Sequence, residues 1–157
     1  MEKINVICVD DQPEVLDAVI RDLRALERHF RIEEVESAGE CRALLDELDQ
    51  RGELVGLVIS DHVMPGESGT ELLGAISRDS RFKHTRKVLL TGQATHADTI
   101  NAINQARIDH YFEKPWQAEE LVVVARRLLT EFILDSGLDY DDIIPALDQQ
   151  VLYQRLK

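Results

Sequence analysis

The feature that most constrains the fold of this chain is a fivefold alternation of short apolar runs and longer segments with helical spacing. The apolar runs predict strands over residues 4–9, 31–36, 54–60, 87–90 and 109–112. Helices are expected after them, over residues 13–28, 37–52, 70–77, 95–106 and 117–134. Strict alternation of this kind is typical of a parallel sheet with helices on both faces. We therefore predict an α/β fold with a doubly wound, five-stranded parallel sheet.

Local signals support the predicted helix starts. Pro13 suits the first turn of a helix, where its missing N–H has no intrahelical partner to lose. Ser37 and Glu40 have the spacing of a capping box, and so do Thr95 and Asp98. Because crossovers between parallel strands are right-handed, only a few strand orders remain for a sheet of this kind.

Length and charge narrow the function classes. The chain has 157 residues, enough for one domain with a proper core and a short appendage. Its net charge of -12 argues against a nucleic-acid-binding surface, because phosphate contacts require clustered Lys and Arg. Apolar runs fall short of membrane length, so we expect a cytoplasmic protein without membrane contact. Cys8 and Cys41 lack metal-ligand spacing, and Cys8 is predicted to be a buried, reduced thiol.

Polar side chains follow four of the five predicted strands, at the sheet edge where ligands collect in such folds. They are Asp10 and Asp11 after the first strand, Asp61 after the third, Thr91 after the fourth and Lys114 after the fifth. Each alone is explained as a helix N-cap or a solvated side chain, but no cap needs three carboxylates together. Like charges this close raise each other's pKa unless a cation is present. The pattern predicts a site for Mg²⁺, or Mn²⁺, with an ammonium and a hydroxyl nearby.

The motifs at these strand ends resemble those of one family. They are Asp10-Asp11, Asp61-x-x-Met64-Pro65 with Gly69, Leu90-Thr91-Gly92, and Tyr111 with Lys114-Pro115. In this order and spacing they resemble the CheY-like receiver domain of two-component response regulators, over roughly residues 3–134. The resemblance implies the strand order 2-1-3-4-5. It divides the chain into a receiver domain, residues 1–134, and a C-terminal helical extension or linker, residues 135–157.

The resemblance implies phosphoryl transfer at this site. Asp61 would accept a phosphoryl group from a cognate histidine kinase or phosphotransfer protein. Asp10, Asp11 and Asp61 would bind the Mg²⁺ together with the backbone carbonyl of Val63. The domain would act on itself, so no turnover of an external substrate is expected and the chain is not predicted to be an enzyme.

The resemblance also implies a switch. Lys114 would bind one phosphoryl oxygen, and Thr91 would form a hydrogen bond to another after phosphorylation. Tyr111 would turn inward to fill the space vacated; an ordinary half-buried strand aromatic is the alternative interpretation. The change would alter the face made by the fourth helix, fifth strand and fifth helix, for a downstream protein target or an output domain to read.

Neighbouring positions bear on the lifetime of the phosphorylated form. Val63 and Gln93 lie two residues after the acceptor and the switch hydroxyl, where the family tunes access of the hydrolytic water. An apolar Val63 cannot orient water, whereas Gln93 can, so we expect slow to intermediate self-dephosphorylation. His62 is interpreted as a surface residue rather than a ligand, and Trp116 as a packing aromatic in preference to a partner-facing one.

Residues 135–157 extend past the fifth predicted helix. We expect Asp139 to Asp142 to cap a further helix with apolar positions at Ile143, Ile144, Leu147, Val151, Leu152 and Leu156. The segment is too short for a DNA-binding or catalytic output domain. It would pack on the receiver core, form a homodimer contact, or begin a linker to a further domain, because an isolated helix of this length is marginal.

Three function classes remain open, of which a phosphorylation-controlled signalling module is favoured. A pseudo-receiver scaffold is expected to lack Asp61, Lys114 or one of the acidic pair, and all are present. A phosphohydrolase of the haloacid-dehalogenase type needs an acid two residues after its nucleophile, where this chain has Val63. A variant of the first class is the N-terminal receiver of a larger multidomain regulator.

Overall fold

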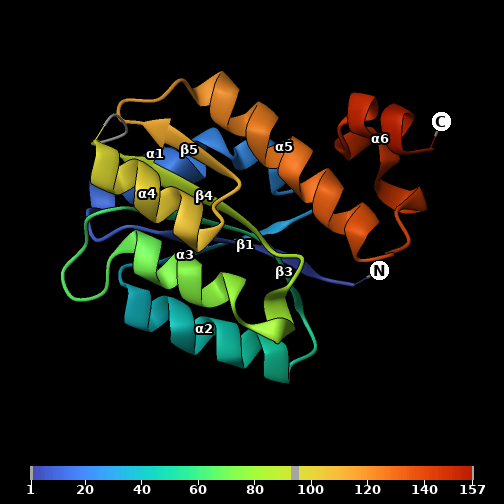
Figure 1. The fold of residues 1–157 in the computed structure, drawn as a ribbon. Coiled ribbons are helices and arrows are strands. Elements are labelled where there is room, and N and C mark those ends of the chain that lie inside the picture. The colour runs from blue at the N-terminus through green and yellow to red at the C-terminus, as the bar shows by residue number, and fades with distance from the viewer. Residues whose placement is uncertain (1, 93–95, 157) are drawn as a thin grey trace.

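A computed structural model describes residues 2–92 and 96–156 of the chain (Figure 1). Its strands are β1 (Ile4–Val9), β2 (Arg31–Val35), β3 (Leu54–Asp61), β4 (Arg86–Thr91) and β5 (His110–Glu113). Its α-helices are α1 (Pro13–Asp22), α2 (Ala38–Gln50), α3 (Gly69–Ser77), α4 (Ala97–Ala106), α5 (Ala118–Asp135) and α6 (Gln149–Leu156). Three 3-10 helices are η1 (Arg24–Leu26), η2 (Ser80–Phe82) and η3 (Asp141–Ala146). The strands are parallel in the order β2-β1-β3-β4-β5, which confirms the predicted fold.

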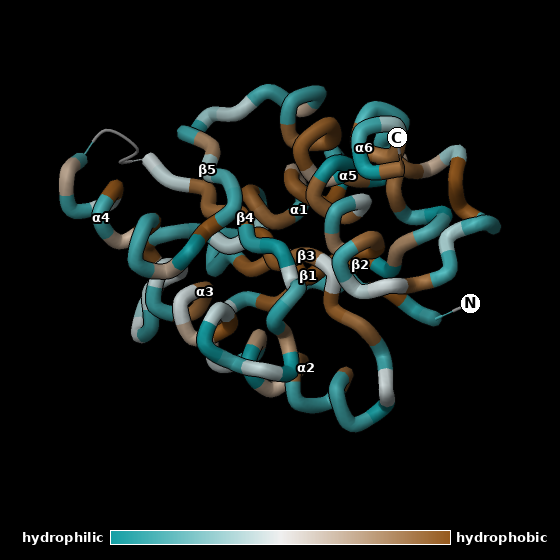
Figure 2. The backbone as a smooth tube through the Cα atoms, turned by 45° about the vertical axis from the view of Figure 1, so that its right-hand side comes forward, coloured by the Kyte–Doolittle hydropathy of each residue, from teal (hydrophilic) through white to brown (hydrophobic). Residues whose placement is uncertain are grey.

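Helices cover both faces of the sheet (Figure 1). α1 and α5 pack on one face, where Val6 and Leu57 belong to their core cluster. α2, α3 and α4 pack on the other, with Ile7 and Val58 in a second cluster. Figure 2 shows hydrophobic segments at β1 and β3 in the centre and hydrophilic loops around them. Alternate residues of the two central strands therefore enter opposite cores.

Side-chain caps begin two of the helices that follow strands. Ser37 accepts a hydrogen bond from the N–H of Glu40 at 3.1 Å, as its capping-box spacing predicts. Ser68 does the same for Glu71 at 3.2 Å and starts α3 immediately after the loop that leaves β3. Thr95, in the second predicted capping box, lies outside the described residues. Within the described part of the chain, no helix is both long and apolar enough to cross a membrane.

The first helix is shorter than predicted, because α1 ends at Asp22 rather than near residue 28 and η1 follows. In η1 the N–H of Leu26 donates to the carbonyl of Leu23 at 2.8 Å. Side chains three residues apart eclipse in a 3-10 helix, so both leucines enter the same core. The carboxylate of Asp22 accepts a hydrogen bond from the indole N–H of Trp116 at 2.8 Å. Trp116 also packs against that core, as predicted.

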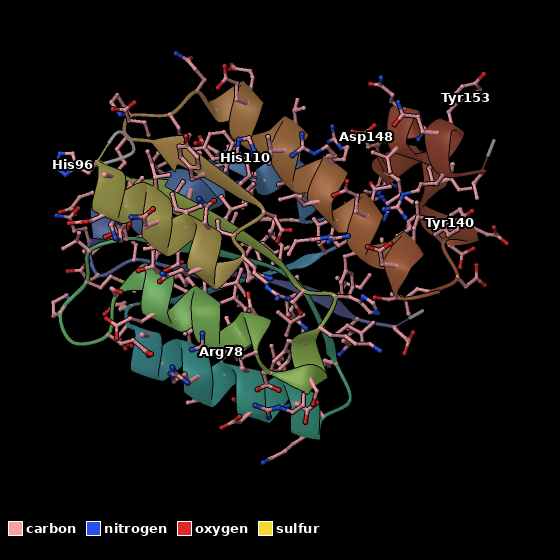
Figure 3. All side chains as sticks on the ribbon, in the orientation of Figure 1. Arg78, His96, His110, Tyr140, Asp148 and Tyr153 are labelled. Carbon is pink, nitrogen blue, oxygen red and sulfur yellow. The ribbon has the colours of Figure 1, made fainter. Side chains whose placement is uncertain are left out.

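The C-terminal segment forms two short helices, η3 and α6, and not the single helix predicted from the sequence. Pro145 lies inside η3 and lacks the amide N–H that a continuing α-helix needs. Asp148, labelled in Figure 3, then starts α6. Its Oδ1 accepts hydrogen bonds from the N–H groups of Gln150 at 3.0 Å and Val151 at 3.2 Å. A proline and a second cap therefore interrupt the apolar pattern that resembled one helix.

The C-terminal segment packs against α5 (Figure 1). Three of its side chains are buried in the core cluster of α1 and α5: Ile143, Leu147 and Leu152. The N–H of Asp148 donates to the buried hydroxyl of Thr130 in α5 at 2.9 Å. Asp135, at the end of α5, pairs with Arg155 of α6 at 2.9 Å and with Arg86 of β4. Of the predicted alternatives for this segment, the structure shows packing on the core.

Candidate functional site

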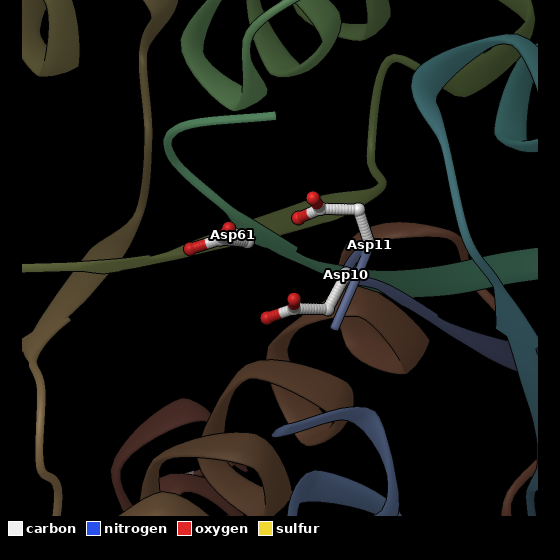
Figure 4. A group of neighbouring side chains, drawn as sticks. All are labelled: Asp10, Asp11 and Asp61. Carbon is white, nitrogen blue, oxygen red and sulfur yellow. The ribbon is translucent and has the colours of Figure 1, made fainter. Parts of the chain in front are cut away.

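The carboxyl edge of the sheet brings three acids together. Asp61 is the last residue of β3, and Asp10 and Asp11 directly follow β1, the strand beside it. One carboxylate oxygen from each lies within 4.8 Å of the others (Figure 4). Asp10 is 1% exposed and Asp61 is 5% exposed, whereas Asp11 is open to solvent. Two buried carboxylates and one exposed carboxylate therefore face a common point.

Lys114 adds a positive charge to this cluster. It directly follows β5, and its backbone N–H donates to the carbonyl of Thr91 at 2.9 Å. Its Nζ lies 2.5 Å from Oδ1 of Asp61 and 3.8 Å from Oδ2 of Asp10. One ammonium beside three carboxylates leaves the cluster negative, so a further cation would still be attracted to it.

Asp10 shows how well a cation fits. Its Oδ1 accepts a hydrogen bond from the N–H of Gln12 at 2.9 Å, while its Oδ2 has no hydrogen-bond partner among the described residues. Burial raises the pKa of Asp10 to about 6, and the nearby charge of Asp61 adds to the effect. A buried anionic oxygen without a donor is unfavourable unless a cation is close. The three carboxylates thus suit Mg²⁺, which takes oxygen ligands and retains waters.

The loop after β3 is held from two sides. Gly69 passes so close to β3 that a Cβ at this position would lie 2.0 Å from the carbonyl oxygen of Asp61. Its N–H donates to the carbonyl of His62 at 2.8 Å. Further along, the carboxylate of Glu67 accepts a hydrogen bond from Nε of Arg42 in α2 at 2.7 Å. The loop therefore follows one course past the acids, and only glycine fits at its return to the strand.

Thr91 and Tyr111 lie in different environments. Thr91 ends β4 and is 1% exposed, and its Oγ1 lies within hydrogen-bond distance, 3.1 Å, of Nδ1 of His62. Burial lowers the pKa of His62 below its ordinary value. Tyr111 in β5 is 43% exposed, so its ring faces outward. Gln93, predicted to act on the hydrolytic water, lies outside the described residues.

An open pocket of about 390 Å³ lies beside Asp11, Asp61 and Lys114. Its lining residues are Asp11, Gln12, Asp61, His62, Val63, Gly92 and Lys114. Val63 stands at its rim with 65% of its surface exposed. The pocket gives a small anion or a partner's side chain access to Asp61.

The structure brings four of the predicted site residues into one cluster: Asp10, Asp11, Asp61 and Lys114. Thr91 lies next to this cluster, and its hydroxyl is within hydrogen-bond distance of His62. His62, predicted from the sequence to be a surface residue, therefore contacts a predicted site residue. The signal for this contact is the strand register. Asp61 of β3 pairs with Leu90 of β4, so the next residue on each strand, His62 and Thr91, are neighbours.

Comparisons with known proteins agree on one family. The response regulator receiver domain family matches residues 6–126. The chain is 30% identical over 154 residues to the hydrogenase transcriptional regulatory protein HoxA of Cupriavidus necator, covering 98% of this chain and 30% of that protein. It is 31% identical over 128 residues to response regulator Rre1 of Synechocystis sp., covering 82% of this chain and 52% of that protein. The chain thus spans about a third of the length of the first of these relatives and about half of the second. A crystal structure of the signal receiver domain of an HD domain-containing protein from Pseudomonas fluorescens Pf-5 has 26% identity and a TM-score of 0.74, covering 87% of this chain and 94% of that one.

Proposed function

This chain belongs to the response regulator receiver domain family, and we propose that it is a phosphoacceptor module in which Asp61 takes a phosphoryl group from a histidine kinase. As a receiver domain it is a signalling module rather than an enzyme. The observation that supports the acceptor role is the cluster of Asp10, Asp11 and Asp61 with the Lys114 ammonium 2.5 Å from Asp61.

In the proposed reaction a carboxylate oxygen of Asp61 attacks the phosphorus of a phosphohistidine in line, and the P–N bond to the kinase breaks. Asp10 and Asp11, together with Asp61, would hold Mg²⁺ or Mn²⁺, and the backbone carbonyl of Val63 is the further proposed protein ligand. When bound, the ion offsets negative charge on the transferring group. Lys114 would bind a phosphoryl oxygen with the ammonium that pairs with Asp61 before transfer.

We propose Thr91 and Tyr111 as the switch. An aspartyl phosphate adds negative charge and strong acceptor oxygens at one point. Thr91 would leave its position beside His62 and donate its hydroxyl to the phosphoryl group, and Tyr111 would turn inward. The outward ring of Tyr111 is consistent with the unphosphorylated state. The movement would change the face of α4, β5 and α5.

Receiver domains pair with histidine kinases. The upstream partner proposed for this chain is a cognate kinase or phosphotransfer protein in the cytoplasm, and the downstream one is a protein target or an output domain. We propose residues 1–134 as the receiver domain proper and residues 135–157 as a helical extension. The packing of α6 on α5 supports a structural role for that extension.

Incubation with acetyl phosphate and Mg²⁺, followed by intact-mass measurement, tests the acceptor role. The wild-type chain should gain the mass of one phosphoryl group, and Asp61→Asn should not. Asp17→Asn is the matched control, because it makes the same chemical change at an exposed position of α1 and should keep the mass gain. If the wild-type chain gains no mass with any phosphodonor, an interaction scaffold that works without phosphorylation is the better description.

Val63→Asn tests the proposed lifetime of the phosphorylated form. Val63 lines the pocket beside Asp61 and is 65% exposed, so an amide there can reach water near the phosphoryl group. The decay of phosphorylated protein should become severalfold faster, measured as the loss of the phosphoryl mass over time. An unchanged decay rate would contradict the role given to this position.

A further inference from the structure

We propose that His62 is a positioning residue that holds the Thr91 hydroxyl in the unphosphorylated state and so opposes the switch. The inference rests on the proposed function of Asp61 as phosphoacceptor. The contact that carries it is the 3.1 Å separation between Nδ1 of His62 and Oγ1 of Thr91. This contact follows from the pairing of β3 with β4, which makes His62 and Thr91 neighbours.

The backbone fixes the His62 ring beside Thr91. The N–H of His62 donates to the carbonyl of Leu90 at 2.9 Å, and this bond continues the β3–β4 ladder one residue past Asp61. The carbonyl of His62 accepts the N–H of Gly69 at 2.8 Å. Because both peptide groups of this residue are bonded, the ring has only its side-chain torsions free. Its Nδ1 is therefore presented to Thr91 by the sheet and by the returning loop together.

The Thr91 side chain must give up this contact to act as a switch. Thr91 is 1% exposed, and its carbonyl accepts the N–H of Lys114 at 2.9 Å. A threonine hydroxyl carries one proton, so it cannot donate to His62 and to a phosphoryl oxygen at once. A hydroxyl that accepts from His62 would keep its own proton for a phosphoryl oxygen, so the proposal takes the Thr91 hydroxyl as the donor and Nδ1 of His62 as the acceptor. In that arrangement the bond stabilises the inactive state alone.

A group that stabilises only the inactive state lowers the apparent affinity of every ligand that requires the active one. The phosphoryl group on Asp61 is such a ligand in the proposed function. Removing the His62 ring nitrogens should therefore shift the equilibrium toward the active state, without changing Asp61 or the acidic pair beside it. His62 would set the balance between the two states through Thr91.

Beryllofluoride with Mg²⁺ serves as the probe, because it mimics a phosphoryl group on a carboxylate without a covalent transfer. Its dissociation constant is measured by titration calorimetry for the wild-type chain and for His62→Phe, which keeps an aromatic ring but no nitrogen. The variant should bind about fivefold more tightly, the effect of losing one neutral hydrogen bond in the inactive state. His84→Phe, at the opposite edge of the sheet, is the matched control and should bind as the wild type does.

The same substitution in a Thr91→Val background separates positioning from a general structural effect. Without the hydroxyl, His62→Phe should change the affinity by less than about twofold, because coupled residues lose their interaction together. Equal or weaker binding by His62→Phe, or the same gain in both backgrounds, would overturn the role of His62. If His62→Phe does not fold, His62→Ala is measured with the same expectations. If the wild-type chain itself binds no beryllofluoride, the acceptor function fails, and this inference fails with it.

Discussion

Replacing Asp10 by asparagine should stabilise the protein when divalent cations are absent. Asp10 is 1% exposed, and its Oδ2 has no hydrogen-bond partner within the part of the chain that the structure describes. Its charge lies close to those of Asp11 and Asp61. Asparagine keeps the oxygen that accepts the Gln12 N–H and removes the buried negative charge. The substitution therefore isolates the cost of assembling a cation site without its cation.

The expected magnitude follows from the pKa of Asp10. Burial raises this pKa from an ordinary 3.8 to about 6, so the ionised form is less favourable in the folded state than in the unfolded chain. Each pKa unit corresponds to about 1.4 kcal/mol, which gives an upper limit of about 3 kcal/mol at neutral pH. Below the unfolded pKa the carboxyl is protonated in both states and the cost is absent. The cost grows as pH rises from the unfolded pKa of 3.8 to the folded pKa of about 6 and is constant above that.

Urea denaturation in the presence of EDTA measures this difference. At about pH 7.5 the free energy of unfolding of Asp10→Asn should exceed that of the wild type by about 1–3 kcal/mol, with an unchanged denaturant slope. At about pH 4 the two proteins should be nearly equal. Added Mg²⁺ should make the wild type the more stable of the two proteins. The ion stabilises the folded state to which it binds, and the variant lacks one of the proposed carboxylate ligands. A variant no more stable than the wild type at neutral pH would refute the reasoning, as would an equal gain at both pH values.

Two further predictions concern packing. Gly69→Ala places a Cβ 2.0 Å from the carbonyl oxygen of Asp61. It should therefore lower the free energy of unfolding by at least about 2 kcal/mol in urea denaturation, and slow phosphorylation followed by intact mass. Wild-type behaviour in both assays would show that the loop moves freely. Leu152→Ala should lower the free energy of unfolding by about 2–3 kcal/mol, because this side chain is 7% exposed in the core beside α5. Tyr153→Ala, at a position that is 71% exposed, should change it by less than about 0.5 kcal/mol. Equal effects of the two substitutions would mean that α6 does not stay docked in solution.

The strands and the acidic cluster could be predicted because both depend on local pattern. Buried parallel strands are continuous apolar runs, and their carboxyl ends share one edge of the sheet. Asp10, Asp61 and Lys114 each directly follow or end such a run, so their convergence needs no knowledge of distances. The strand order is different: periodicity permits several orders, and 2-1-3-4-5 came from the family resemblance.

Other features depend on tertiary contacts that local pattern does not contain. The early end of α1 follows from placing Leu23 and Leu26 in one core, and helical spacing alone also permits a longer helix. The division of the C-terminal segment requires the buried hydroxyl of Thr130, which receives the N–H of Asp148. The contact between His62 and Thr91 becomes visible only when the register of β3 and β4 is known. In the last two cases the deciding partners are 18 and 29 residues apart in sequence.

The hydrogen bond between Trp116 and Asp22 gives the protein a built-in optical probe. Trp116 is the single tryptophan of the chain, so all indole emission comes from one place. It stands two residues after Lys114, and its N–H is bonded to the last residue of α1 at 2.8 Å. If Lys114 moves toward a phosphoryl group as proposed, the movement would be transmitted to this indole over two residues of backbone. A shift in the emission wavelength of Trp116 on addition of a phosphodonor is then expected, and it would be measured without attaching a dye.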